Sequence, residues 1–291
     1  MQANQHDLRV MVRGAYDLQK LRIQMGNRIV GNFKAKLGQA PGESEDASLD
    51  AEGKKIINDL RAHYRKITDG VKTYPRQKSF KGDEVISSYT ELCLIGQYVD
   101  LESDETRHFT RLGNVLDDYA VYREYLSEVR GIGPAMAGVI ISEIDISKAR
   151  YSSSLWKYAG LDVAENGQGR SRKAEHLVKV SYVNRDGEEA ERNSITFNPF
   201  LKTKLIGVLA PSFIKLSNPI YAPIYRGYKH RLESNPAHQD KSKGHRDNMA
   251  KRYMIKIFLI DLYKAWRTIE GFPVTPPYHE GKLGIVHRDA A

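Results

Sequence analysis

Residues 128–147 read Glu-Val-Arg-Gly-Ile-Gly-Pro-Ala-Met-Ala-Gly-Val-Ile-Ile-Ser-Glu-Ile-Asp-Ile-Ser, and this stretch decides the fold of the second half of the chain. Gly131 and Gly133 flank Ile132 between two apolar runs, which predicts a sharp turn between two helices. Pro134 suits the first position of the second helix, where its missing N–H costs nothing. The pattern predicts a helix-hairpin-helix whose open amides face a phosphate oxygen, with Gly131 and Gly133 as nucleic-acid contacts. The alternative is a plain helical corner buried in a core.

The positive charge of the chain is concentrated in its second half. Residues 1–128 contain 19 lysine and arginine residues and 20 aspartate and glutamate residues, whereas residues 129–291 contain 26 and 16. An excess of this size attracts polyanions, with a strong dependence on salt. The charge therefore favours the nucleic-acid interpretation of the hairpin over the plain corner.

Length and composition limit the class of protein. The chain has 291 residues and 41% apolar content, enough for a sizeable core and for two domains. Its apolar runs are too short to span a bilayer, and its first residues lack the pattern of an export signal. Cys93 is the only cysteine, so neither an internal disulfide nor a thiolate metal site is expected. These features predict a protein of the cytoplasm without membrane association.

The first 128 residues show the apolar spacing of amphipathic helices joined by polar connectors. Asp117 and Asp118 are adjacent on an expected helix, where they diverge and face solvent. No apolar strand carries the spaced carboxylates that a two-metal nuclease domain needs. We expect a coiled-coil-like arm that pairs with itself or a partner, or an ordinary antiparallel bundle. The expected helices cover residues 7–37, 49–67, 86–101 and 103–129.

Downstream of the hairpin, residues 150–161 predict a short helix that ends at a glycine. Residues 162–173 then contain glycines and basic side chains without an apolar period. Arg170, Arg172 and Lys173 surround the hydroxyl of Ser171, as a phosphate-facing loop requires, although a solvated loop would have the same composition. Residues 177–197 predict two strands joined by a turn at residues 184–187.

The remaining basic half favours contact with a phosphate backbone. Asn198 and Pro199 predict a helix start, and Pro211 predicts a kink or an end. Tyr221, Tyr225 and Tyr228 share one helix face, which is typical of a core but would also stack on bases. The histidines at 238, 245, 279 and 287 show no metal-ligand spacing, so no metal site is expected. Basic residues before an apolar run at 254–262 are further candidate contacts, with a solvated charge run as the alternative: Lys243, His245, Arg246, Lys251 and Arg252.

Several of these blocks, in this order, resemble the carboxy-terminal domain of the Piv/MooV-type DNA invertases and related insertion-sequence transposases. The resemblance covers roughly residues 115–280 and rests on short blocks. It implies a role in DNA recombination, with Ser171 as the nucleophile. The blocks are residues 132–137, 143–147, 151–161, the serine behind them, 198–205 and 245–266.

The sequence departs from this family in three respects. No counterpart of the family's amino-terminal nuclease-like domain, with its acidic tetrad, is visible. Asp162 and Val163 stand where the family has a proline, and Ser171 lies further along than expected. The two expected strands form an insertion. Ser171 is therefore a nucleophile by position, with Arg170, Arg172, Lys173 and His176 near enough in sequence to supply charge or a proton acceptor.

We expect a mainly α protein with a helical arm over residues 1–128 and a basic domain over residues 129–291. The basic domain contains the helix-hairpin-helix and a small β-hairpin insertion. The expected function is DNA binding in recombination or transposition, with self-association through the arm. The sequence leaves open whether the chain is a serine-dependent recombinase, and Mg²⁺ is expected only with a carboxylate-bearing partner. The alternatives are an accessory protein that binds structured RNA and a helical protein-interaction scaffold.

Overall fold

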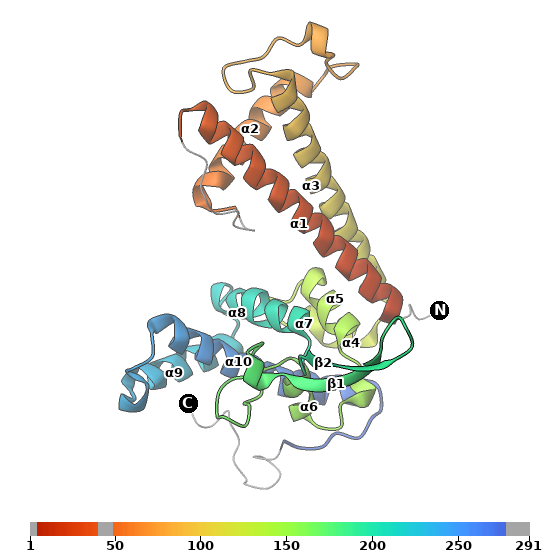
Figure 1. The fold of residues 1–291 in the computed structure, drawn as a ribbon, viewed down its shortest axis with the longest axis vertical. Helices are drawn as coiled ribbons and strands as arrows, with labels where there is room; N and C mark the ends of the chain where they lie inside the picture. Colours follow the sequence, from red (N-terminus) through yellow and green to blue (C-terminus); the bar gives the residue numbers. More distant parts are fainter. Residues whose placement is uncertain (1–4, 40–48, 278–291) are drawn as a thin grey trace. The chain divides into compact units, whose positions relative to one another are not determined.

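The computed structural model describes residues 5–39 and 49–277, and Figure 1 shows that they are mainly helical. Among these residues the strands form a single two-stranded antiparallel sheet. The expected fold class is therefore confirmed. The chain divides into a helical unit, Val10–Leu112, and a carboxy-terminal unit made of Met1–Arg9 and Gly113–Ala291. Packing thus separates the units at residue 112, and the assignment of different functions to residues 1–128 and 129–291 stays a prediction.

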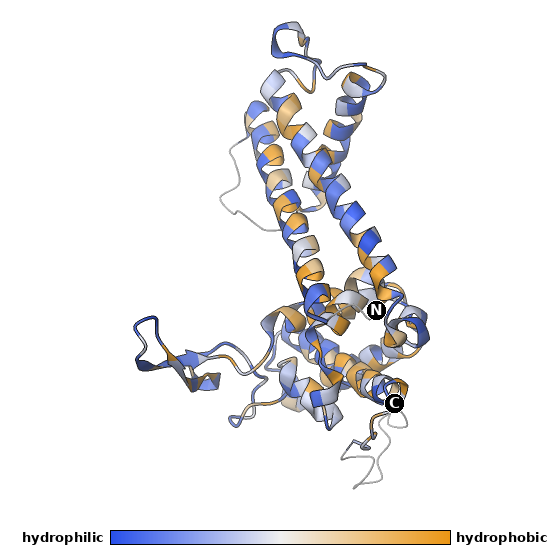
Figure 2. Cartoon of the chain, turned by 90° about the vertical axis from the view of Figure 1, so that its right-hand side faces the viewer, coloured by the Kyte–Doolittle hydropathy of each residue, from blue (hydrophilic) through white to orange (hydrophobic). Residues whose placement is uncertain are grey.

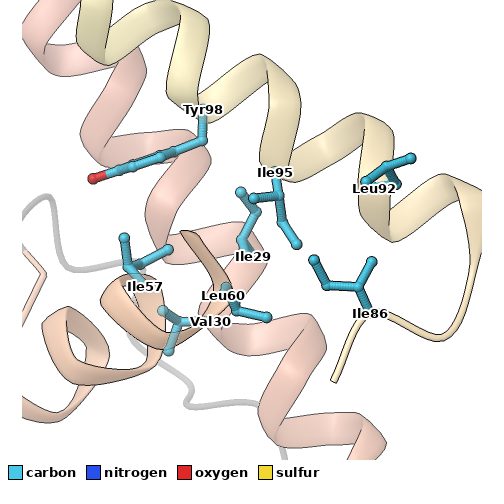
Figure 3. Packing of buried hydrophobic residues seen from close by; sticks show 8 residues of the cluster. All are labelled: Ile29, Val30, Ile57, Leu60, Ile86, Leu92, Ile95 and Tyr98. Carbon is cyan, nitrogen blue, oxygen red and sulfur yellow. The ribbon is translucent and has the colours of Figure 1, made fainter. Parts of the chain in front are cut away.

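The helical unit contains α2 (Ala51–Thr68) and most of α1 (Gln5–Lys36) and α3 (Tyr89–Leu116). Hydrophobic residues recur along these helices between hydrophilic ones, as amphipathic helices require (Figure 2). All three helices contribute to one buried cluster, in which burial stabilises the fold by about 1.5–3 kcal/mol per large side chain (Figure 3). Its members are Ile29, Val30, Ile57, Leu60, Ile86, Leu92, Ile95 and Tyr98.

The course of α3 differs from the expectation of two helices at residues 86–101 and 103–129. One helix runs without a break to Leu116, because no proline interrupts the sequence between the expected pair. It ends before Asp117 and Asp118, which lie in a turn rather than on a helix. Aspartate favours turns because its side chain competes for backbone hydrogen bonds.

The carboxy-terminal unit is built around α10 (Lys243–Ile269), whose apolar face is buried along most of its length. Ser242 begins this helix, and its side chain accepts a hydrogen bond from the amide of His245. The rings of Phe213, Tyr221 and Phe258 pack together with centroids 4.8–5.5 Å apart. The other helical elements are α4 (Ala120–Glu124), η2 (Leu126–Glu128), α5 (Pro134–Glu143), η3 (Ile146–Lys148), α6 (Ser152–Tyr158), η4 (Ala174–His176), α7 (Pro199–Lys204), η5 (Leu205–Leu209), α8 (Ala210–Lys215), α9 (Tyr221–Ser234) and η6 (Pro236–His238).

Pro211 does not end the helix that begins at Pro199. Instead, α7 continues through η5, a π-helical turn, into α8. The amide of Ala210 bonds to the carbonyl of Leu205, five residues earlier. We attribute the wider turn to Pro211, which has no N–H to donate and whose ring crowds the preceding turn.

The expected β-hairpin is present as β1 (Val178–Val183) and β2 (Glu189–Ser194). Val178 pairs with Ser194 at its base, and Gly187 in the connecting turn has φ 82°. Every β1 residue is exposed, and Figure 2 shows the hairpin extending away from the helices of its unit. The hairpin therefore contributes little to the core.

Among the described residues, no helix combines the length and apolar character needed to cross a bilayer.

Candidate nucleic-acid interface and serine site

In the hairpin corner, residues 130–134, the carbonyl groups at its beginning are bonded within the protein, whereas the residues at its end are exposed. The carbonyl of Arg130 accepts a hydrogen bond from Asn218 Nδ2 at 2.7 Å, and that of Gly131 accepts one from Ser212 Oγ at 2.8 Å. These bonds hold the two carbonyl groups against α8 and the turn that follows it. Gly133 and Pro134 are exposed, and no side chain caps the first turn of α5. Pro134 has no N–H, and the amides of Met136 and Ala137 donate to the Gly133 carbonyl, so the amide of Ala135 is the first-turn donor that can bind an anion.

Gly131 is required for two reasons. Its φ of 104° is in a region that favours glycine, and a Cβ there would lie 3.0 Å from the ring of Phe213. The corner is therefore partly packed, and only its Gly133 side is open. The expected first helix of the pair is short, consisting of α4 and η2.

A second group of residues gathers around the serine loop, residues 162–176, which follows α6. Ser171 Oγ lies 2.8 Å from His176 Nδ1, and the Ser171 amide donates to the same nitrogen at 3.0 Å. On the other side of the ring, Asn166 Nδ2 and Oδ1 lie 3.0 and 3.3 Å from Nε2. His176 is 4% exposed, whereas Ser171 is half-buried. The loop thus brings the half-buried Ser171 into contact with the buried imidazole ring of His176.

Arg170 is committed to the structure of the loop. It forms an ion pair with Asp162, with Nη2 2.9 Å from Oδ2. The second oxygen of this carboxylate, Oδ1, is buried and has no hydrogen-bond partner among the described residues. Arg170 is therefore a positioning residue here, and its predicted contact with nucleic acid stays a prediction.

Three partly buried cations lie beside the serine loop: Lys202 from α7 and Arg252 and Lys256 from α10. We name them the cation cluster. Lys202 Nζ donates to the carbonyl of Arg170 at 2.5 Å, next to Ser171 in the chain. In the described part of the chain, no carboxylate forms an ion pair with any of the three.

Burial and mutual repulsion disfavour the charged forms of these side chains. Burial, together with Arg252 and Arg172, lowers the pKa of Lys202 to about 8. Burial also lowers the pKa of Arg252. For Lys256, burial lowers the pKa, the carboxylate of Asp162 opposes this shift, and Arg252 adds to it. A cluster of this kind is stabilised by a bound anion, because the anion supplies the missing negative charge.

Two packing contacts hold the cation cluster in place. The guanidinium of Arg252 lies against Gly169, where an added Cβ would collide with it. The ammonium of Lys256 lies 5.2 Å from the ring centroid of Trp156, whose Nε1 donates to the Lys256 carbonyl at 3.1 Å. The absent side chain of Gly169 therefore positions one cation, and α6 positions another.

The other predicted contacts lie in two kinds of surroundings. Arg246 donates to the carbonyls of His238 and Lys241, and Lys251 pairs with Asp247 at 2.6 Å. These contacts are intramolecular. Arg172, Lys173, Lys243 and His245 are exposed. Their contact with nucleic acid stays a prediction.

Sequence reasoning missed Lys202, Lys256 and Asn166. Lys202 follows the helix start at Asn198, and Lys256 lies inside the apolar run of α10. From the sequence, both looked like lysines on the solvent-facing side of a helix. Their partial burial without a carboxylate is visible only in the fold. Asn166 showed no signal beyond its place in a glycine-rich loop.

The described residues contain no group of three or more histidine, cysteine, aspartate or glutamate side chains able to hold a metal ion. Asp162, the carboxylate in contact with the serine loop, already binds Arg170 through Oδ2. These residues do not fit a divalent cation, which needs several oxygen ligands. His279 and His287 lie outside the described residues.

Residues 123–185 match the sequence model of the IS116/IS110/IS902 transposase family. The match supports a relation of this segment to insertion-sequence transposases. The segment includes the hairpin corner, α5, α6 and the serine loop, and the match supports a role in transposition at that level. A comparison with curated proteins finds no match to the chain. The closer resemblance to the Piv/MooV-type invertases stays a prediction.

Proposed function

We propose that this protein binds DNA during transposition and holds a backbone phosphate at the cation cluster beside Ser171. The observation that supports this most directly is the partial burial of three cations without a paired carboxylate. Cations on a solvated surface are hydrated on all sides. Here Arg252 packs against Gly169 and Lys256 packs against Trp156, so both have lost part of their hydration. The match of residues 123–185 to a transposase family supports the same function.

The hairpin corner supplies a second, weaker contact in this proposal. Its Gly133 side is open, and the first turn of α5 is uncapped. Backbone amides bind phosphate without reading the base sequence, so this contact would position DNA rather than select a site.

Ser171 is the nucleophile in this proposal if the chain cuts DNA. Ser171 is half-buried, and Lys202 donates to the carbonyl of the preceding residue, Arg170, where its charge would stabilise a phosphate. Carboxylates and Mg²⁺, where strand cleavage needs them, would come from a partner. DNA binding does not depend on that step.

The proposal is tested by measuring the affinity of the protein for labelled duplex DNA and, in parallel, for folded RNA. Arg252→Gln removes a charge from the cation cluster, and Lys55→Gln removes one from an exposed position on α2. We expect the first variant to weaken DNA binding by about tenfold, as loss of one charge-assisted phosphate contact predicts, and the second to bind like the wild type.

Equal losses in the two variants would mean that the net charge alone binds DNA, and the assignment to the cation cluster would be wrong. Tighter binding of folded RNA than of duplex DNA would favour the RNA-binding alternative. A protein that binds neither polymer at low salt would be a scaffold.

A further inference from the structure

We propose that His176 is the general base that takes the proton of Ser171, and that Asn166 holds its imidazole in the form able to do so. The inference rests on the proposed function for its natural substrate, a phosphodiester. It rests on the geometry of the serine loop for the assignment of the base.

The hydrogen bonds around His176 fix its tautomer. A backbone amide can only donate, so the Ser171 amide at 3.0 Å requires a lone pair on Nδ1. The ring proton of the neutral form is therefore on Nε2. Asn166 Oδ1 accepts from the amide of Gln168 at 3.0 Å, which identifies it as the oxygen of the side-chain amide. Both ends of the Asn166 amide face Nε2, with Nδ2 at 3.0 Å and this oxygen at 3.3 Å. Of the two, only the oxygen can accept the Nε2 proton.

The hydroxyl of Ser171 is oriented by the same network. Ser171 Oγ accepts from the amide of Lys173 at 3.3 Å and lies 2.8 Å from His176 Nδ1. Because Nδ1 carries no proton, the hydroxyl can donate to it and shares the single lone pair of Nδ1 with the Ser171 amide. A hydroxyl that donates to an unprotonated imidazole is arranged for proton transfer.

Burial distinguishes this pair from a surface contact. His176 is 4% exposed and Ser171 is half-buried, so a phosphate can approach the oxygen while water is kept from most of the ring. The charged group in contact with the ring is Glu175, whose Oε1 lies 3.8 Å from Nε2. Glu175 and the Asn166 oxygen both lie on the Nε2 side of the ring, whereas Ser171 contacts Nδ1.

The proposed step is a displacement at phosphorus. Ser171 Oγ forms a bond to phosphorus, and the bond from phosphorus to a sugar oxygen breaks. The proton of Ser171 passes to His176 Nδ1, and the departing sugar oxygen, which lies across phosphorus from Oγ, takes a proton from water. Lys202, bonded to the carbonyl of Arg170, lies near enough to stabilise the negative charge on the phosphate.

The alternative is that His176 is structural and only joins Ser171 to Asn166 within the loop. The substitution His176→Asn separates the two roles, because asparagine Oδ1 can replace Nδ1 as the acceptor for the Ser171 amide but cannot take a proton near neutral pH. The variant Asn166→Asp tests the orientation. A carboxylate beside Nε2 stabilises the imidazolium, so a proton-acceptor role predicts that the acid limb of the reaction moves to higher pH.

The experiment uses a fluorophosphonate probe on the full chain, with modification of Ser171 followed by mass spectrometry and without DNA. The serine displaces fluoride from phosphorus, so the probe reports the activated hydroxyl directly. We expect the wild type to be labelled at Ser171, and Ser171→Ala to lose this label. We expect His176→Asn to react about 100-fold more slowly, and Asn166→Asp to show the shifted pH profile.

Equal labelling of the wild type and His176→Asn would show that His176 only fastens the loop. Absence of any label on wild-type Ser171 would overturn the proposal too. Thermal melting identifies a variant that does not fold, and in that case the pH profile of Asn166→Asp decides. Because the probe test contains no DNA, a failure of DNA binding leaves this result unchanged, and a failure here leaves DNA binding unchanged.

Discussion

At Gly169, the absence of a side chain determines where a cation lies. The guanidinium of Arg252 occupies the space that a Cβ would need. Gly169→Ala should therefore displace the end of a flexible side chain, with little effect on stability, and weaken DNA binding several-fold. Fluorescence anisotropy and thermal melting measure the two effects.

Gly227→Ala is the matched control for this change. Gly227 lies in α9 with no atom within 4 Å of the added Cβ, so alanine should stabilise the helix by up to about 1 kcal/mol and leave DNA binding unchanged. If Gly169→Ala also binds DNA normally, Arg252 does not contact the phosphate.

Lys202 gives DNA binding a characteristic pH dependence. Burial and neighbouring cations lower its pKa to about 8 from an ordinary value of 10.5, so the group loses its charge as pH rises through about 8. A bound phosphate raises this pKa. We expect proton uptake on binding near pH 8, and affinity that falls as pH rises above it. Calorimetry in buffers of different ionisation enthalpy measures the uptake.

Lys202→Arg keeps the charge but does not titrate in this range. Its affinity should be flat where that of the wild type falls. Folding has the opposite sign, because the depressed pKa of Lys202 disfavours the folded state below pH 8, and this cost is relieved as pH rises toward 10.5. A wild type with flat affinity across this range would show that Lys202 does not bind the phosphate.

The sequence predicts single residues of the site better than their combination. Ser171, His176 and Arg252 were all indicated by local pattern. The meeting of α7 with α10 around the serine loop was not, because residues far apart in one sequence give no sign of contact. Lys202 and Lys256 were missed for that reason.

At the level of elements, the β-hairpin should be dispensable for folding. All of β1 and most of β2 are exposed, so their removal deletes little buried surface. Val178 pairs with Ser194, so a Gly-Gly linker between Leu177 and Ile195 can replace the strands. We expect thermal melting of this variant to match the wild type within a few degrees. A large loss of melting temperature would show that the hairpin packs on its unit.

Helix boundaries show what local patterns determine. The start of α7 at Asn198 and the glycine after α6 were predicted from capping rules, and the structure confirms them, with Gly160 at φ 64°. The continuous α3 was predicted wrongly, as two helices. For Pro211 a kink or an end was predicted, and the helix does not end there but passes through a π-helical turn. In both places tertiary packing and a π-helical turn decide the course of the helix, and neither is visible in local sequence.

For the whole molecule, charge and packing divide the chain at different places. The excess of basic residues begins near residue 129, whereas the compact units separate at residue 112. The boundary between compact units depends on apolar contacts, whereas the distribution of charge depends on what the surface binds, so the two boundaries need not coincide. Self-association through the helical unit stays a prediction.

The most direct test of phosphate binding at the cation cluster is the salt dependence of DNA affinity, from about 50 to 200 mM. Each neutralised phosphate contributes about 0.9 to the slope of log affinity against log salt concentration. The triple variant Lys202→Gln, Arg252→Gln, Lys256→Gln should therefore show a slope smaller by about 1 than that of the wild type, since one phosphate is held at the cluster. An unchanged slope in a folded triple variant would contradict phosphate binding at this cluster.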